Sequence, residues 1–95
     1  MDLVFGVSYD SDIKKTKDVL MQILTSHPKV LKEPAPSVNL LELADSSINF
    51  AVRPWCASAD YWTVYFEVTE QTKEALDTAG IEIPYPHQVE IRKKG

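Results

Sequence analysis

A chain of 95 residues is long enough for one domain and too short for two. Its hydrophobic fraction of 44% and charged fraction of 25% are ordinary for a globular protein, which excludes disordered and collagen-like classes. The 14 acidic residues outnumber the 10 basic ones, so the formal net charge is −4. Nucleic-acid binding depends on a basic surface that neutralises phosphates, and this acidic chain is a poor candidate for it.

The cysteine count and the lengths of the apolar runs indicate which cellular compartment fits this chain. Cys56 is the single cysteine, so an intrachain disulfide and a paired-cysteine metal or redox motif are excluded. We expect it to be a small buried or half-buried residue in a reducing compartment such as the cytoplasm. Apolar runs such as residues 3–7 are far shorter than the roughly 20 residues that a membrane-spanning helix needs. The N-terminus lacks a signal-peptide pattern, and a strand directly after Met1 suggests a start at a domain boundary.

The first predicted elements are a strand over residues 3–8 and a helix over residues 12–26. Alternation places the apolar side chains of the strand on one face: Leu3, Phe5 and Val7. The helix carries a stripe of side chains at helical spacing: Ile13, Thr16, Leu20, Ile23 and Leu24. We expect the N-cap of this helix at Asp10 or Ser11, with Asp12 adding negative charge to the first turn.

A hairpin is predicted next, over residues 38–43 and 48–55, because a short polar turn separates two apolar runs. Three apolar side chains of the second strand alternate onto one face: Ile48, Phe50 and Val52. We expect this face in the core and Arg53 outside, because a register slip of one residue would bury Arg53. In the first strand Val38 and Leu40 take the core face, which places Glu42 on that face at the rim of the hairpin.

Residues 60–79 have a mixed signal, because the segment starts with residues of high β propensity. Its larger side chains nevertheless recur at spacings of three or four: Tyr61, Tyr65, Val68, Thr72, Leu76 and Ala79. Asp60 is a suitable cap and Gly80 a suitable left-handed stop, so we predict a helix. We expect its aromatic residues to pack between helix and sheet: Tyr61, Trp62, Tyr65 and Phe66.

The last predicted elements are a short strand over residues 81–83, a rigid break at Pro84 and Pro86, and a strand over residues 87–91. The order of elements predicts the α+β class, with a ferredoxin-like βαββαβ sandwich. Two helices cover one face of a four-stranded antiparallel sheet, and an extra strand follows at the C-terminus. We assign residues 1–86 to the sandwich and residues 87–95 to a C-terminal strand and tail.

No motif for catalysis, a cofactor or a metal is found, so we predict that this protein is not an enzyme. His27 and His87 are far apart and have no Cys, Asp or Glu at ligand spacing, which makes each a satisfied or exposed histidine. Ser46 and Ser47 have neither an elbow motif nor a base nearby in sequence. The chain has three glycines in total and no glycine-rich phosphate loop.

Three segments carry a resemblance to a known family. Residues 5–13 read FGVSYDSDI, residues 46–55 read SSINFAVRPW, and residues 79–86 read AGIEIPYP. In this order and spacing they resemble the strand-to-helix entry, the hairpin strand and the exit of one domain, the C-terminal cytoplasmic α/β domain of small-conductance mechanosensitive (MscS) channels. The resemblance covers nearly the whole chain. This sequence does not contain the transmembrane helices, the pore or the β domain of the family, so tension sensing and gating would reside elsewhere.

The resemblance implies a homoheptamer in the bacterial inner membrane that releases ions and small solutes during hypoosmotic shock. This domain would face the cytoplasm as part of a vestibule wall, without contacting the membrane or nucleic acid. The hairpin rim would lie near the lateral portals of the vestibule, so we hypothesise that Glu42 biases which ions pass. The alternative for Glu42 is an exposed carboxylate without a role.

The segment of His87, Val89 and Ile91 is interpreted as an assembly strand. The two prolines prevent it from continuing the preceding strand as one ladder. A lone strand has unpaired edges, which invite pairing with another chain. The resemblance implies that copies of this strand close into a small barrel at the base of the vestibule, with Val89 and Ile91 inside. The alternative is pairing with a sheet edge of its own domain.

A second function follows from the predicted fold alone. Many ferredoxin-like domains are regulatory modules that bind a small metabolite at a subunit interface. A thermal-shift screen with amino acids and nucleotides separates the two functions, because a specific ligand stabilises the folded state by mass action.

Overall fold

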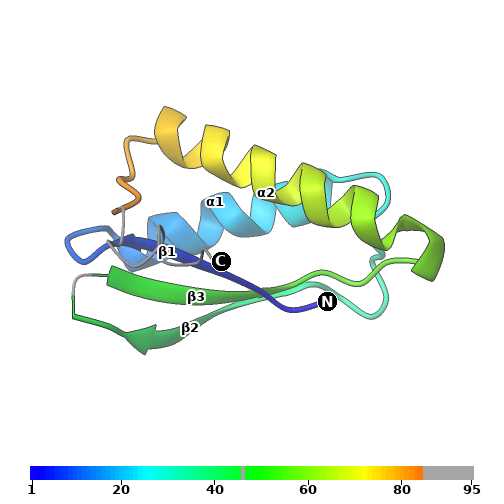
Figure 1. Ribbon diagram of the computed structural model, residues 1–95, viewed down its shortest axis with the longest axis horizontal. Coiled ribbons are helices and arrows are strands. Elements are labelled where there is room, and N and C mark those ends of the chain that lie inside the picture. The colour runs from blue at the N-terminus through cyan, green and yellow to red at the C-terminus, as the bar shows by residue number, and fades with distance from the viewer. Residues whose placement is uncertain (46, 85–95) are drawn as a thin grey trace, which may run out of the picture.

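The computed structural model describes residues 1–45 and 47–84, which form two layers. The elements are, in chain order, β1 (Leu3–Ser8), α1 (Ile13–Ser26), β2 (Ser37–Leu43), β3 (Ser47–Arg53), the 3-10 turn η1 (Ser58–Asp60) and α2 (Tyr61–Thr78). The strands form one antiparallel sheet in the order β1-β3-β2. Both helices lie on the same side of this sheet, as Figure 1 shows. The predicted α+β class is therefore confirmed.

The central strand β3 carries the core of the sheet. Its register runs from Leu3 opposite Val52 to Ser8 opposite Ser47 on the β1 side. The predicted inward face is confirmed, because three alternate residues of β3 are 4% exposed or less: Ile48, Phe50 and Val52. Arg53 lies outside and its Nε is 3.1 Å from Oδ1 of Asp2. The helices contribute fully buried side chains that pack against this face: Leu20, Leu24, Val64, Val68 and Leu76.

A β-bulge in β2 moves Glu42 to the face of the sheet that points away from the helices. Leu40 is opposite Phe50 and Glu42 is opposite Asn49, so Leu41 is an extra residue between the two pairs. Asn49 faces outward because it alternates with the buried residues of β3. Glu42 shares that outward face, and its predicted position on the core face is wrong because the extra residue reverses the alternation.

Helix α1 starts where the sequence predicts, but its cap is a different residue. Asp12 has extended backbone angles, and its side chain accepts a hydrogen bond from the Lys15 N–H at 3.0 Å. Asp12 is thus the N-cap, and the prediction of Asp10 or Ser11 is wrong. The Ser11 N–H instead donates to the Ser8 carbonyl and closes the preceding turn, so the cap falls one or two residues later than predicted.

Helix α2 forms as predicted, but most of its aromatic side chains are not in the core. The buried positions of α2 are Val64, Val68, Thr72 and Leu76. Trp62 and Phe66 are each two residues from Val64, which places them about 200° around the helix from it. They are 63% and 62% exposed. Tyr61 is 39% exposed, and Tyr65 is half-buried against the core, so the predicted core position holds for Tyr65 alone.

The end of α2 confirms the predicted glycine stop. Gly80 has a φ of +75°, in the region that favours glycine. Its N–H donates to the Asp77 carbonyl, and the Ile81 N–H donates to the Leu76 carbonyl, which is the pattern of a Schellman motif. This turn directs the chain back toward the sheet.

The predicted strand over residues 81–83 does not form, so the sheet has three strands in the part of the chain that the structure describes. One backbone hydrogen bond, from the Ser8 N–H to the Glu82 carbonyl at 2.7 Å, holds this segment beside the end of β1. A single bond is not enough for a ladder, and Pro84 has no N–H to extend it. The assembly strand predicted over residues 87–91 lies outside the described residues.

The exposures of two phenylalanines predict very different effects on stability. Phe50→Ala removes a fully buried ring and should lower the free energy of unfolding by about 3–5 kcal/mol. Phe66→Ala truncates a ring that is 62% exposed, and as a matched control it should cost about 0.5 kcal/mol or less. Urea unfolding of the 95-residue chain at a concentration where it is monomeric measures both. Equal losses would show that the face of β3 is misassigned.

Candidate functional site

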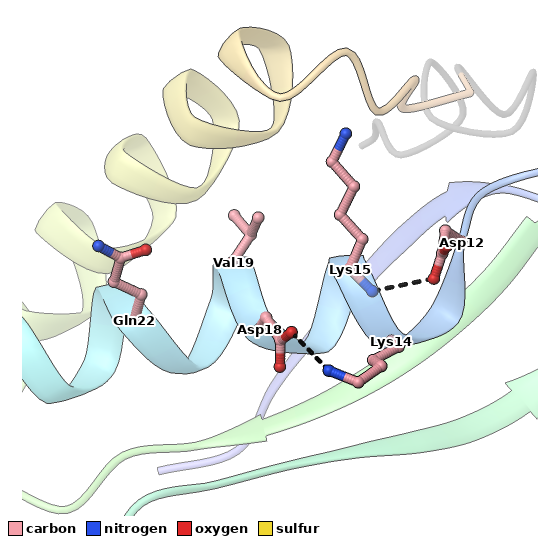
Figure 2. Close-up of a pocket in the computed structure, with 6 residues that line it drawn as sticks. All are labelled: Asp12, Lys14, Lys15, Asp18, Val19 and Gln22. Carbon is pink, nitrogen blue, oxygen red and sulfur yellow. Dashed lines mark hydrogen bonds and ion pairs between the residues drawn. The ribbon is translucent and has the colours of Figure 1, made fainter.

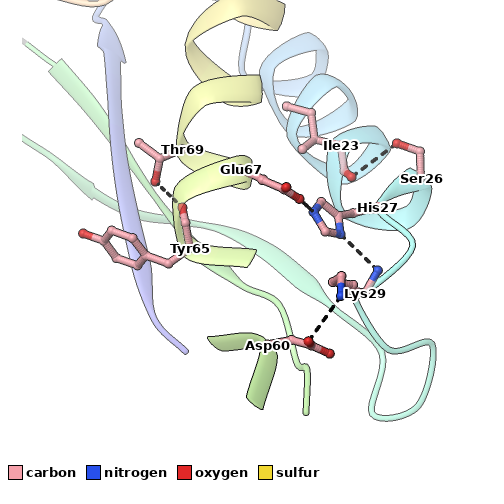
Figure 3. Close-up of polar contacts among 8 residues, drawn as sticks. All are labelled: Ile23, Ser26, His27, Lys29, Asp60, Tyr65, Glu67 and Thr69. Atoms are coloured by element: carbon pink, nitrogen blue, oxygen red, sulfur yellow. Dashed lines mark hydrogen bonds and ion pairs between the residues drawn. The ribbon is translucent and has the colours of Figure 1, made fainter. Parts of the chain in front are cut away.

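The histidine in the described residues is structural. His27 is 4% exposed at the end of α1, and both of its ring nitrogens have partners (Figure 3). Nδ1 accepts from the Lys29 N–H at 3.1 Å, so the ring proton is on Nε2, which donates to Glu67 of α2 at 2.7 Å. Lys29 in turn pairs with Asp60 at 3.4 Å. The ring connects the end of α1 to α2, and neither nitrogen is available to a ligand. His87 is outside the described residues.

The hollow along α1 has charged groups that are already engaged. Figure 2 shows Lys14 paired with Asp18 and Asp12 bonded to the backbone N–H of Lys15. The Nζ of Lys15 reaches across to the Ala79 carbonyl at 3.0 Å and ties α1 to the end of α2. These charged side chains stabilise the helices and their contact.

A metal or catalytic centre is not found in the described ranges, 1–45 and 47–84. They contain no group of three or more His, Cys, Asp or Glu residues that could hold a metal ion. Cys56 is half-buried, as predicted, and packs against the core. The Ser47 hydroxyl donates to Asn49, with no base beside it.

The predicted portal residue belongs to a polar cluster on the outer face of the sheet. Glu42 is exposed, and its Oε2 accepts from the Asn49 side-chain amide at 3.1 Å. Oδ1 of Asn49 accepts from the Ser47 hydroxyl at 3.0 Å, so both ends of the amide are used. Gly6 of β1 is opposite Asn49, and a Cβ at Gly6 would lie 2.8 Å from Oδ1. The spacing of these residues in the sequence does not predict this cluster, because only the bulge brings Glu42 to Asn49.

Exposed apolar side chains form the other distinctive feature of the surface. We call the exposed rings at the start of α2 the aromatic surface: Tyr61, Trp62 and Phe66. The Trp62 and Phe66 rings stack with centroids 5.9 Å apart, and Tyr61 meets Trp62 edge-on at 5.1 Å. A second group lies at the α1 and β2 side of the molecule, where Ile13, Leu40 and Leu43 are 43%, 38% and 59% exposed.

Fold and surface together define a two-layer α+β domain with exposed apolar side chains on its surface. The polar contacts described above join elements of the fold, and they do not account for the exposed apolar side chains. No helix in the described part of the chain is long and apolar enough to cross a bilayer.

Comparisons with known proteins identify the family. The family described as "Mechanosensitive ion channel MscS, C-terminal" matches residues 1–83. An uncharacterised MscS-family protein of Synechocystis is 43% identical over 88 residues, which are 93% of this chain and 30% of that protein. The small-conductance mechanosensitive channel of Edwardsiella ictaluri is 42% identical over 86 residues, 90% of this chain and 30% of the channel. The chain belongs to the MscS family and corresponds to its C-terminal domain.

Solved structures agree with this assignment. The closed-state crystal structure of Helicobacter pylori MscS matches with a TM-score of 0.84 and 31% identity, over 90% of this chain and 34% of that one. A cryo-EM structure of Arabidopsis thaliana MSL1 matches with a TM-score of 0.72 at 15% identity, which shows the fold alone. The chain thus spans about a third of the length of these relatives. Channels of this family are membrane proteins and homo-oligomers, and they are not enzymes.

The Gly6 and Asn49 contact predicts a non-additive pair of substitutions. Gly6→Ala forces Asn49 to move and breaks its bonds to Ser47 and Glu42, so it should cost about 1–2 kcal/mol of stability. In an Asn49→Ala background the same substitution should cost little, because the obstructing amide is gone. Thermal unfolding of the unchanged protein, the two single variants and the double variant measures this cycle. If the two losses of stability are additive, the Asn49 side chain is not the reason that position 6 needs a glycine.

Proposed function

We propose that this domain forms part of the wall of the cytoplasmic vestibule of an MscS-type channel and takes part in subunit assembly. The observation that carries the proposal is the family match over residues 1–83, supported by the fold similarity to Helicobacter pylori MscS. The channel is proposed to be a homoheptamer of the bacterial inner membrane that opens under tension and releases ions and small solutes. The engaged polar groups of the α1 hollow give no support to the alternative of a metabolite-binding module.

Two finer features of the fold belong to this proposal. In the assembled channel, residues 81–83 form a fourth strand beside β1 and complete a ferredoxin-like sheet. The strand order β1-β3-β2 and the bond from Ser8 to Glu82 support this position. Residues 87–95, with His87, Val89 and Ile91, form the assembly strand and tail beyond the domain of residues 1–86. The alternation of Val89 and Ile91 with polar residues supports this role.

The proposed function is tested with the full-length protein that carries this domain. Expression in a bacterial strain without mechanosensitive channels should restore survival of a hypoosmotic downshock. Patch recordings from the same membranes should show openings that depend on suction. A matched control is the same protein truncated before this domain, which should reach the membrane in smaller amounts or as fewer assembled channels. Full-length protein that assembles in the membrane but neither protects cells nor opens under suction would contradict the proposal.

The Glu42 hypothesis remains a proposal with a separate test. Removing a negative charge at a portal should make the channel less selective for cations, since the local concentration of cations falls. Glu42→Gln in the full-length channel should therefore shift the reversal potential in asymmetric salt toward anion preference. Glu33→Gln is the control, because this exposed carboxylate lies in the loop between α1 and β2, at the other end of the molecule from the β2–β3 turn (Figure 1). Identical reversal potentials in all three channels would leave Glu42 without a role in selectivity.

A further inference from the structure

We propose that the aromatic surface of α2 packs against the α1 and β2 side of the next copy of this chain, in a head-to-tail contact. This inference rests on the proposed assembly function and specifies its surfaces. It follows from where the exposed apolar groups lie, from their charged neighbours, and from the geometry that a ring of identical subunits requires.

Two rings of the aromatic surface, Trp62 and Phe66, lie on the solvent-facing side of α2. On the α1 side, Glu67 bonds to His27, and Gln71 and Glu74 line the groove between the helices. Each residue advances about 100° around a helix, so Trp62 lies about 120–180° and Phe66 about 80–140° around the helix from these three. Nothing in the described residues covers the two rings, which are 63% and 62% exposed.

Such a cluster is unusual on a surface that water alone contacts. Burying an aromatic side chain contributes a large share of apolar free energy, and tryptophan and tyrosine are enriched where two proteins meet. The rings of Trp62, Phe66 and Tyr65 also contact one another, which restricts their motion before any partner arrives. A preordered aromatic cluster loses less side-chain entropy on binding than separate flexible groups do.

The complementary surface is on the opposite side of the molecule. Figure 2 shows Lys15 and Val19 on the α2 side of α1, and Ile13 and Lys17 are turned away from it by the helical period. This outer side of α1 lies next to β2, since α1 packs on that strand. Leu40 and Leu43 of β2 are opposite Phe50 and Ile48, so they point toward the helix layer. We call this group the β2 flank: Ile13, Lys17, Leu40 and Leu43.

The two surfaces differ in charge as well as in position. Helix α2 has four carboxylates against one lysine, namely Glu67, Glu70, Glu74, Asp77 and Lys73. Helix α1 has three lysines against one carboxylate, namely Lys14, Lys15, Lys17 and Asp18. Within the described residues, Glu70 beside the aromatic surface and Lys17 in the β2 flank make no ion pair. Contact between unlike surfaces is therefore attractive, whereas two aromatic surfaces facing each other would bring like charges together.

Symmetry favours the same arrangement. A ring of identical subunits needs two different surfaces on each copy, because each interface joins one surface to the other. The aromatic surface is at the N-terminal end of α2, whereas the β2 flank is at the end where α1 starts and β2 finishes, and Figure 1 shows these as opposite ends of the molecule. One copy can therefore use both surfaces at once, with two neighbours.

Cysteine cross-linking in the full-length channel in native membranes tests this interface. The background replaces every cysteine of the full-length channel, Cys56→Ser among them, and the test variant adds Trp62→Cys and Leu40→Cys. A disulfide forms only where two Cα atoms lie within about 7 Å of each other. The cysteines are therefore linked with a flexible bis-maleimide, which spans a longer distance, and not by oxidation. We expect a ladder of linked oligomers from the double variant and unlinked subunits from either single variant. The matched control joins Trp62→Cys to Asn39→Cys, which is exposed one residue from Leu40 on the outer face of β2 and should not link.

Three results would overturn the interface. One is the absence of ladders from the double variant. The second is dimers from Trp62→Cys alone, which would show two aromatic surfaces facing each other. The third is equal linking by the Asn39 control, which would show random collision. The same membranes are scored for survival of downshock, so a channel that protects cells without linking removes this interface and leaves the proposed function standing.

Discussion

The central position of β3 is the constraint on which the rest of the fold depends. This strand pairs antiparallel with β1 on one side and β2 on the other. The side chains of β3 alternate between the two faces of the sheet. Once Phe50 is buried, the face of every other residue in β3, and of the residues paired with them, is fixed. The helices then cover the one face that is apolar along all of β3. A strand buried on one face and paired on both edges is the least replaceable part of a small sheet, because its loss removes both ladders and the floor of the core.

Several polar side chains in this domain are committed to the fold. His27 joins the end of α1 to α2, Lys15 joins the start of α1 to the end of α2, and Asn49 bridges two strands of the sheet. Each of these contacts joins segments that are apart in sequence or on neighbouring strands. A domain of this size buries limited apolar surface, and satisfied polar contacts between its elements specify one arrangement. Exposed apolar side chains such as Trp62 and Phe66 take no part in these contacts, which suits a domain that meets other protein chains.

Local patterns in the sequence determined much of this structure. The positions of β1, α1, β3 and α2 follow from periods of two and about 3.6 residues, which depend on neighbours along the chain. The inward face of β3 follows from the same alternation, because exchanging the faces would bury Arg53. The stop at Gly80 follows from the freedom of glycine at positive φ. The family was also visible in short segments, because these combine turn, strand and helix-entry residues that recur together.

Tertiary structure alone decided the positions that depend on contacts between elements. The bulge at Leu41 is a property of the pairing between β2 and β3, and it carried Glu42 to the outer face. The rings of Trp62 and Phe66 were expected in the core because aromatic residues usually bury. Val64 and Val68 occupy the inward side of α2 instead, and one helix cannot turn both sets toward the same sheet. The hydrophobicity of each residue indicates whether its burial would stabilise the fold. Only the packing of helix against sheet determines which of these residues are buried.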